Sequence, residues 1–180
     1  MLLHRYSEVL NMPVVCVNNG RSIGTVKDVI LNLDSKDVMG ILLVHQRLCF
    51  GMQVIMLDDI NNISTDAVVA ESRDNVKKMK KEAYEKTFAS NESLIGRRVF
   101  SRSGSELGII RDFIFNSRSG RIEELDISEG VLQDIMSGRK RLPLIGRTEF
   151  GEEFAVVDNE AVEEMEESGG GLKNKLLKEN

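Results

Sequence analysis

The sequence has no tryptophan, only two prolines, and an aromatic content of 5%. Nucleobases are commonly bound by stacking on aromatic side chains, so this composition disfavours a single-strand binder and also a carbohydrate binder. Positive charge is not in excess either. The net charge is −5, whereas a protein that binds the phosphate backbone usually has a basic balance, at least locally.

The chain also lacks the signals of a secreted or membrane-inserted protein. Its two cysteines, Cys16 and Cys49, are not in a CxxC arrangement, and no apolar run approaches the roughly 20 residues that span a bilayer. The segment Met1–Leu10 is interrupted by polar and charged residues, unlike a signal peptide. We therefore expect a cytoplasmic protein with two packing thiols and no membrane insertion.

No catalytic or metal-binding constellation is recognisable. The two histidines, His4 and His45, have no set of His, Cys, Asp or Glu residues around them at ligand spacing, and no nucleophile lies in a recognisable setting. The glycine pair Gly20 and Gly24 is not followed by the Lys-Ser/Thr of a phosphate-binding loop. The sequence therefore predicts a protein that is not an enzyme, with no cofactor and no metal.

What the sequence does contain is one passage that occurs twice. Residues 12–44 and 96–128 align without a gap at an offset of 84, a register in which Val15 corresponds to Val99. A duplicated unit indicates a tandem architecture. The shared glycines and aspartates are expected to define the fold; they are Gly20, Gly24 and Asp28 in the first copy and Gly104, Gly108 and Asp112 in the second.

These shared residues have structural explanations. The first glycine of each copy is expected in a turn, and the second where a strand bends or another backbone comes close. The aspartates could form a catalytic pair only if the two copies faced each other there. We favour a role as short acceptors for backbone N–H groups at a strand bend.

Short apolar segments alternate with Gly, Asn, Asp and Ser turns in both copies, which is typical of small antiparallel barrels or sandwiches. Between the copies, Val76, Met79 and Ala83 lie near helical spacing among lysines, which indicates a helix with one buried stripe. The sequence therefore predicts a mainly β protein with two tandem small antiparallel β-barrels joined by a short helix. The predicted ranges are 1–72 for the first barrel, 73–91 for the helical connector, 92–167 for the second barrel and 168–180 for a flexible tail.

The copies differ on one strand face. Where the first copy has apolar residues, the second has Asp126 and Ser128, whereas the opposite face is apolar in both. An exposed apolar face usually marks a contact surface. We expect it either to pack against the second copy or the connecting helix, or to bind a partner. The candidate contact residues here are Leu42, Val44, Leu48 and Phe50.

The second copy has its own peculiarity in Gly130–Arg141. Its apolar residues indicate a helical turn or two; they are Val131, Leu132, Ile135 and Met136. A basic triplet follows, Arg139, Lys140 and Arg141, which could touch RNA or an acidic protein face, or be a solvated loop.

The chain resembles the PRC-barrel family on the following residues: Leu94-Ile95-Gly96-Arg97-Arg98-Val99, then Gly104-x-x-x-Gly108-x-x-x-Asp112, then Ser119-Gly120-Arg121-Ile122. In the first copy Asn11-Met12 replaces Ile-Gly, and Lys36-Asp37 replaces Gly-Lys/Arg. The resemblance covers nearly all of residues 8–70 and 92–158, and the tandem arrangement is similar to that of bacterial PRC-barrel proteins. It implies a six-stranded β-barrel per copy. Relatives in the photosynthetic reaction centre H subunit and in a ribosome-maturation factor are thought to act through protein contacts.

We therefore expect a non-catalytic protein–protein interaction or adaptor module, in which self-association is one possibility. A first alternative is an RNA- or ribosome-associated assembly factor that uses lysines of the connector and Arg139–Arg141 as phosphate contacts. A second alternative is a small-molecule or metal sensor, which requires a polar-lined cavity. Neither the partner nor the process is specified by the sequence.

Overall fold

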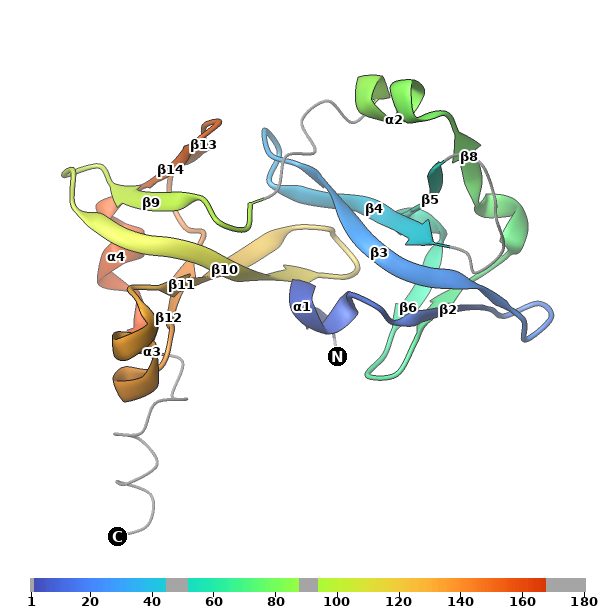
Figure 1. The fold of residues 1–180 in the computed structure, drawn as a ribbon, viewed down its shortest axis with the longest axis horizontal. Coiled ribbons are helices and arrows are strands. Elements are labelled where there is room, and N and C mark those ends of the chain that lie inside the picture. Colours follow the sequence, from blue (N-terminus) through green and yellow to red (C-terminus); the bar gives the residue numbers. More distant parts are fainter. Residues whose placement is uncertain (1, 45–51, 88–93, 168–180) are drawn as a thin grey trace, which may run out of the picture. The chain divides into compact units, whose positions relative to one another are not determined.

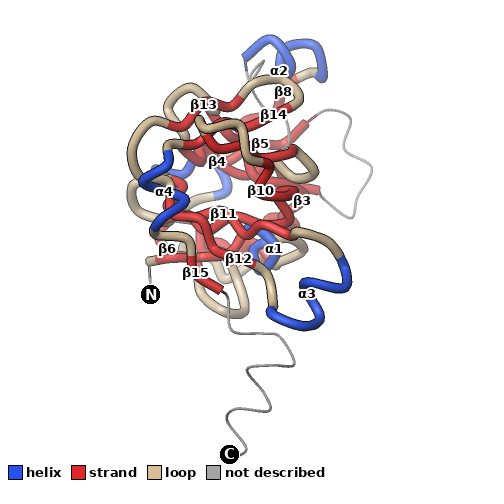
Figure 2. The backbone as a smooth tube through the Cα atoms, turned by 90° about the vertical axis from the view of Figure 1, so that its left-hand side faces the viewer, coloured by secondary structure: helices blue, strands red, loops and turns tan. Residues whose placement is uncertain are grey.

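The computed structural model describes residues 2–44, 52–87 and 94–167, and it is mainly β (Figures 1 and 2). The chain begins with β1 (Leu3–Arg5), which pairs with β10. The strands of the first copy are β2 (Pro13–Cys16), β3 (Ser22–Asn32), β4 (Asp37–Val44), β5 (Met52–Met56), β6 (Ile60–Ile63), β7 (Val68–Ala70) and β8 (Lys77–Met79). Those of the second are β9 (Arg98–Ser101), β10 (Glu106–Asn116), β11 (Ile122–Ser128), β12 (Lys140–Pro143), β13 (Thr148–Phe150), β14 (Phe154–Val157) and β15 (Glu166–Glu167).

The helical elements are short. The α-helices are α1 (Tyr6–Val9), α2 (Lys81–Thr87), α3 (Val131–Ser137) and α4 (Asn159–Glu163), and two 3₁₀ turns are η1 (Leu57–Asp59) and η2 (Arg73–Asn75). Helices of this length are marginal by themselves in water, so their stability comes from packing and from capping contacts.

The two copies form sheets with the same strand order. The first sheet runs β6-β7-β2-β3-β4-β5-β8, and the second runs β13-β14-β9-β10-β11-β12-β15. One pair in each sheet is parallel, β2 with β7 and β9 with β14. The prediction of a mainly β protein with two tandem domains and a short joining helix is confirmed, and the repeat extends to a closing strand, β8 or β15, in each copy.

Each copy is built around one long strand that is buried most fully toward its C-terminal end. In β3 and β10 almost the same pattern of buried and exposed positions recurs, and Val26 and Ile110 are fully buried at equivalent places. The second copy adds the large buried rings of Phe113 and Phe115. Burying a side chain of this size contributes about 1.5–3 kcal/mol, so these strands form the centre of each core.

The predicted gapless alignment is wrong in the first strand. The backbone N–H of Asn11 donates to Val26 O, and that of Gly96 donates to Ile110 O, at 2.9 and 2.8 Å. Asn11 and Gly96 also share a left-handed backbone, with φ of 64° and 94°. They are therefore equivalent at an offset of 85, and Val14, rather than Val15, is the counterpart of Val99. The turn after β2 has one more residue than the turn after β9 (17–21 against 102–105).

The second shared glycine of each copy lies against the backbone of the next strand. A Cβ atom on Gly24 would be 2.8 Å from the carbonyl oxygen of Val44, and one on Gly108 would collide with the carbonyl oxygen of Ser128. Gly20 and Gly104 occupy turns with positive φ, where glycine has no steric penalty. The turn geometry therefore requires the first glycine of each copy, and the close approach of the next strand requires the second.

The shared aspartates accept backbone hydrogen bonds. Asp28 Oδ1 accepts from the backbone N–H of Val29 at 2.8 Å and from the hydroxyl of Tyr6 at 3.0 Å. Asp112 Oδ1 accepts from the backbone N–H of Phe113 at 2.9 Å. The pairing of β3 with β4 shifts register just before Asp28. The carboxylate therefore accepts a hydrogen bond from a backbone N–H next to the bulge, where the regular strand pairing is interrupted.

The connector is not one helix over 73–91. Residues Arg73–Asn75 form η2, with Ser72 as its cap, and Lys77–Met79 form β8 on the edge of β5. Only Lys81–Thr87 is α-helical, and residues 88–93 lie outside the described residues. Val76 and Met79 are three residues apart, which fits one face of a helix. However, Val76 caps the end of η2 and Met79 pairs with Met52 of β5, so strand pairing overrides the local spacing.

The chain divides into two compact units that do not coincide with the two copies. The first comprises 1–92 together with Phe115–Ile122, and the second comprises 93–114 and 123–180. Inside the first unit, Val38 N–H donates to Gly120 O at 2.7 Å, and Ile122 N–H donates to Lys36 O at 3.0 Å. These four residues are related by the offset of 84, so the contact is reciprocal. The predicted domain limits stay a prediction.

Candidate interaction surface

The apolar face predicted for β4 is mostly not exposed. Leu42 is 5% exposed and packs in an apolar cluster with Tyr84 of α2. The connecting helix therefore covers this face, and Leu42 does not contribute to a contact surface. Val44, at the end of β4, is half exposed. Leu48 and Phe50 lie outside the described residues.

The corresponding face of the second copy is polar but also buried. Asp126 and Ser128 on β11 are both almost inaccessible. The Ser128 hydroxyl donates to Asp134 Oδ2 at 2.7 Å, and it accepts from the backbone N–H of Gly130 at 3.3 Å. The difference between the copies thus concerns a buried layer, and in the second copy that layer anchors the segment that follows.

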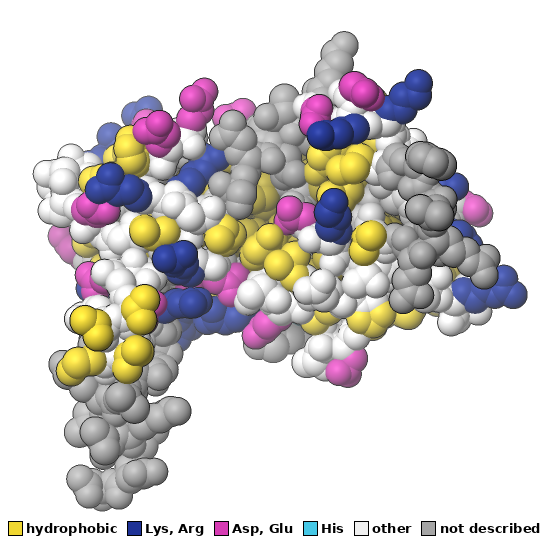
Figure 3. Space-filling view, viewed as in Figure 1, with side chains coloured by type: hydrophobic (Ala, Val, Ile, Leu, Met, Phe, Trp, Pro, Cys, Tyr) yellow, Lys and Arg dark blue, Asp and Glu magenta, His cyan; other side chains and the backbone are white. Residues whose placement is uncertain are grey.

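That segment is α3, a helix whose apolar side chains face the solvent. The four large ones are exposed by 50–82%; they are Val131, Leu132, Ile135 and Met136. A surface helix normally buries its apolar stripe and exposes its polar face. Here the acidic residue Asp134 contacts Ser128 of the protein body instead. Figure 3 shows the resulting apolar cluster, and Figure 2 shows α3 at the periphery of the second unit.

Both ends of α3 are defined by a backbone hydrogen bond and a glycine. The backbone N–H of Asp134 donates to Gly130 O at 2.9 Å, and the N–H of Gly138 donates to Asp134 O at 3.0 Å. Both glycines have a positive φ, 133° and 86°, which lets the chain turn sharply into and out of the helix. The orientation of the helix is set by the hydrogen bond from Ser128 of β11 to Asp134.

The basic triplet after α3 is paired with acidic side chains. Arg139 Nε lies 3.7 Å from Asp134, and Lys140 Nζ lies 2.8 Å from Glu129. Arg141 has a longer contact with Glu124, 3.8 Å between Nη1 and Oε2. Each cation of the triplet thus has an acidic neighbour within 4 Å, and the charge around α3 is close to balanced.

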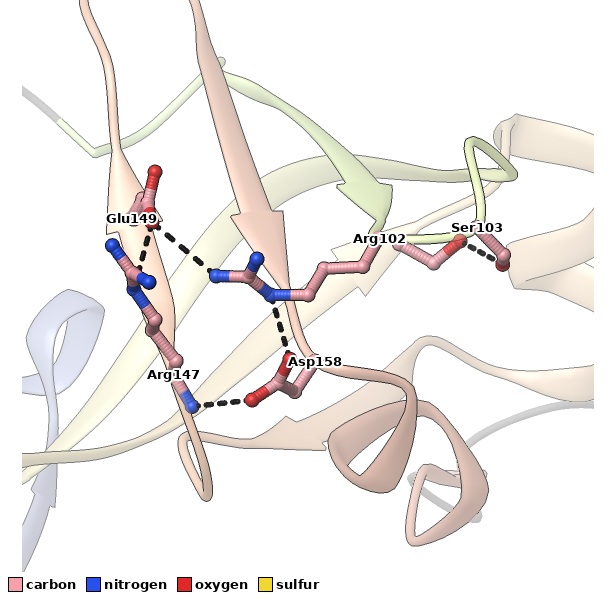
Figure 4. Close-up of polar contacts among 6 residues, drawn as sticks. Arg102, Ser103, Arg147, Glu149 and Asp158 are labelled. Carbon is pink, nitrogen blue, oxygen red and sulfur yellow. Dashed lines mark hydrogen bonds and ion pairs between the residues drawn. The ribbon is translucent and has the colours of Figure 1, made fainter.

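A closed ionic network ties together strand ends in the second unit (Figure 4). Arg102, which follows β9, contacts Asp158 at 2.6 Å and Glu149 of β13 at 3.2 Å. Arg147 contacts Glu149 at 2.9 Å, and its backbone N–H donates to Asp158 at 2.7 Å. Each charged side chain of this network is paired with another residue of the second unit, so the role of the network is structural.

A second exposed cluster lies on β9 and β14. Arg98 donates to both oxygens of Glu106, at 2.8 and 2.5 Å, and its guanidinium lies 5.1 Å above the centre of the Phe100 ring. The Phe100 and Phe154 rings meet edge to face at 5.4 Å. The hydrogen bond from Arg98 lowers the pKa of Glu106. This cluster has no reactive geometry and is a surface packing motif.

Metal and membrane chemistry find no geometric support in the described residues. Within 2–44, 52–87 and 94–167, no three His, Cys, Asp or Glu side chains converge as metal ligands. No helix in these ranges is both long and apolar enough to cross a bilayer.

Comparison with known proteins assigns the repeat to one domain type. The model of the PRC-barrel domain matches the chain twice, over residues 1–74 and 86–161. No curated protein matches the sequence. The two matches follow the two copies, and α3 lies inside the second.

Proposed function

The chain belongs to the PRC-barrel family, and from this membership together with the geometry of α3 we propose that it is a non-catalytic module that binds a partner protein. The observation that supports the proposal is the outward-facing apolar helix. Each of the four large apolar side chains of this seven-residue helix is at least half exposed. A monomeric soluble protein rarely exposes such a contiguous patch without a binding role.

The spacing of these side chains suits a groove on the partner. Val131 and Ile135 are four residues apart, as are Leu132 and Met136, so they form adjacent pairs on the helix surface. Helices that dock in apolar grooves use anchors at this spacing. A convex helix fits a concave partner, so we propose that the partner supplies an apolar groove.

The charges around α3 favour a protein over RNA as the partner. In an RNA-binding factor Arg139–Arg141 would contact phosphates and release counterions. Instead each of these cations is within 4 Å of a carboxylate of the same unit. Contact with phosphate would compete with these pairs, whereas burial of the apolar side chains leaves them undisturbed.

We predict that the double variant Leu132→Asp, Ile135→Asp loses its partner while keeping its fold. Both side chains are at least half exposed, so the expected change in unfolding free energy is within about 0.5 kcal/mol. Loss of two anchors is expected to weaken binding by about 30-fold or more. The measurement is photo-crosslinking from Gln133 in the full chain, with unfolding followed by circular dichroism.

The matched control is Val17→Asp, which changes an apolar side chain of similar exposure, 56%, in the first unit. It should crosslink the same proteins as the wild type. Equal crosslinking by the double variant and the control would show that α3 is not the binding surface.

We further predict that partner binding is nearly independent of ionic strength. Because the local charges are already paired, the affinity should change by less than about 3-fold between about 50 and about 500 mM NaCl. An RNA complex held by several phosphate contacts would lose orders of magnitude over this range. Fluorescence anisotropy with the crosslinked partner, and separately with a single-stranded RNA, distinguishes the two; steep salt-dependent RNA binding would contradict the proposal.

A further inference from the structure

A pocket of about 300 Å³ opens in the first unit where β5, β8 and η2 meet. Its floor is the buried side chain of Ile23, and its wall includes Val76. The polar residues that line it are Gln53, Arg73, Asp74 and Lys78. The volume is at the lower end of the range for small-molecule sites.

The polar residues are placed by regular structure. Gln53 and Lys78 are directly opposite each other in the antiparallel pair of β5 and β8, so their side chains lie on one face, a few ångströms apart. Arg73 and Asp74 belong to η2, where Ser72 Oγ accepts from the backbone N–H of Asp74 at 3.2 Å. The amide of Asn75 donates to Asp59 at 2.6 Å and fixes the end of this turn.

The hydrogen-bonding capacity of these groups is unused within the described part of the chain. Gln53 is 7% exposed, yet its amide has no hydrogen bond to any described residue. Arg73, Asp74 and Lys78 likewise have no ion pair among residues 2–44, 52–87 and 94–167. The Gln53 amide is not sealed from solvent, and the pocket that it lines is the side from which a ligand can reach it.

The second copy shows that this chemistry is not required by the fold. By repeat register, Gln53 corresponds to Lys140, which is paired with Glu129 at 2.8 Å. Arg73 corresponds to Glu160, and Glu160 lines a pocket of about 350 Å³ in the second unit. The acidic residues of that pocket are Glu124, Glu160, Glu164 and Glu166. The pocket of the second unit has one cation, Arg141, among four glutamates, so the excess of cations over carboxylates is specific to the first copy.

We propose that the pocket of the first unit binds a small zwitterion, namely a free α-amino acid with an aliphatic side chain. Arg73 and Lys78 supply two cations for the carboxylate, and the Gln53 amide adds a neutral donor. Asp74 supplies the counter-charge for the ammonium group. Ile23 and Val76 form the apolar surface for the side chain. One anion beside two cations disfavours a dianionic phosphate and fits a ligand with charges of both signs.

The test is titration of the full chain with L-leucine, followed by calorimetry and by amide chemical shifts. We expect saturable binding with a Kd in the millimolar range or tighter. Arg73→Ala, which changes an exposed side chain, should weaken binding about 10-fold or more, because it removes a charged hydrogen-bond donor. Gln53→Leu, which keeps the volume, should also weaken binding. Lys77→Ala is the matched control, since Lys77 is adjacent on β8 but does not line the pocket.

Two analogues of leucine separate the zwitterion from simpler ligands. Leucinamide lacks the carboxylate, and 4-methylpentanoate lacks the ammonium group; both should bind at least about 10-fold more weakly than leucine. Equal binding of either analogue would overturn the assignment to a zwitterion. The absence of saturable leucine binding, or binding that neither Arg73→Ala nor Gln53→Leu weakens, would overturn the site. These outcomes are independent of partner binding by α3.

Discussion

Gly108→Ala is expected to unfold the second unit or to cost it several kcal/mol. Gly108 has a φ of 129°, a conformation that L side chains rarely adopt, and an alanine held there costs about 1–2 kcal/mol in strain. A Cβ atom there would also collide with the carbonyl oxygen of Ser128 and approach Ile127 Cγ2 at 2.8 Å. Both contacts belong to β11, so relief requires separation of the two central strands. Chemical denaturation followed by circular dichroism measures the loss.

Gly104→Ala is the control for strain alone. Gly104 also has a positive φ, 89°, but a Cβ atom there meets nothing within 4 Å. It should therefore cost only about 1 kcal/mol. If the two variants were equally stable, the close approach of β10 and β11 at Gly108 would not be a determinant of the fold.

The strands of both copies could be predicted because their signal is local. Alternating apolar residues and Gly, Asn or Asp turns specify a strand before any tertiary contact is known. The register of the first strand could not be predicted in the same way. Val14 and Val15 are both apolar, so offsets of 84 and 85 match equally well in composition. The paired hydrogen bonds and positive φ of Asn11 and Gly96 distinguish them, as does the shorter turn after β9.

The proposed contact surface was predictable in part. The sequence points to Gly130–Arg141 as unusual, and α3 lies there. It does not show that the apolar residues of α3 face the solvent, because their spacing also fits an ordinary buried stripe. That orientation depends on the bond from Ser128 to Asp134, a contact between β11 and the helix. The pocket at Gln53 was missed for a similar reason: its residues come from separate segments that only the pairing of β5 with β8 brings together.

For Leu42 the structure confirms the alternative of packing against the connecting helix, and only its use as a contact residue was wrong. When the two copies are aligned, Leu42 of the first copy corresponds to a polar residue of the second. The greater apolar content of the first copy at this strand face suggests an exposed patch. The alignment cannot show whether another segment covers this face. Here Tyr84, which lies outside the aligned passages, packs over Leu42. The same apolar cluster includes Met52, Met56 and Met79, whose flexible side chains fill irregular gaps. Burial of Leu42 therefore changes what its substitution should do.

Leu42→Asp is expected to destabilise the first unit by about 3–5 kcal/mol, the cost of leaving a buried charge without a partner. Its neighbour on the same strand face, Val44, is half exposed, so Val44→Asp should cost less than about 1 kcal/mol. Thermal or urea unfolding of the two full-length variants measures the difference. A similar, small loss in both would show that α2 does not cover β4 in solution.

The pH dependence of the Leu42→Asp variant provides a sharper test of the same burial. An apolar environment raises the pKa of the introduced carboxyl above its unfolded value of about 3.9. The folded state then binds more protons than the unfolded state, so stability relative to the wild type falls as the pH rises from about 4 through the raised pKa. The deficit should therefore be smaller near pH 4 than at pH 7. For Val44→Asp, whose carboxyl is solvated, the deficit should be almost independent of pH, and a flat profile for both variants would contradict the covered position of Leu42.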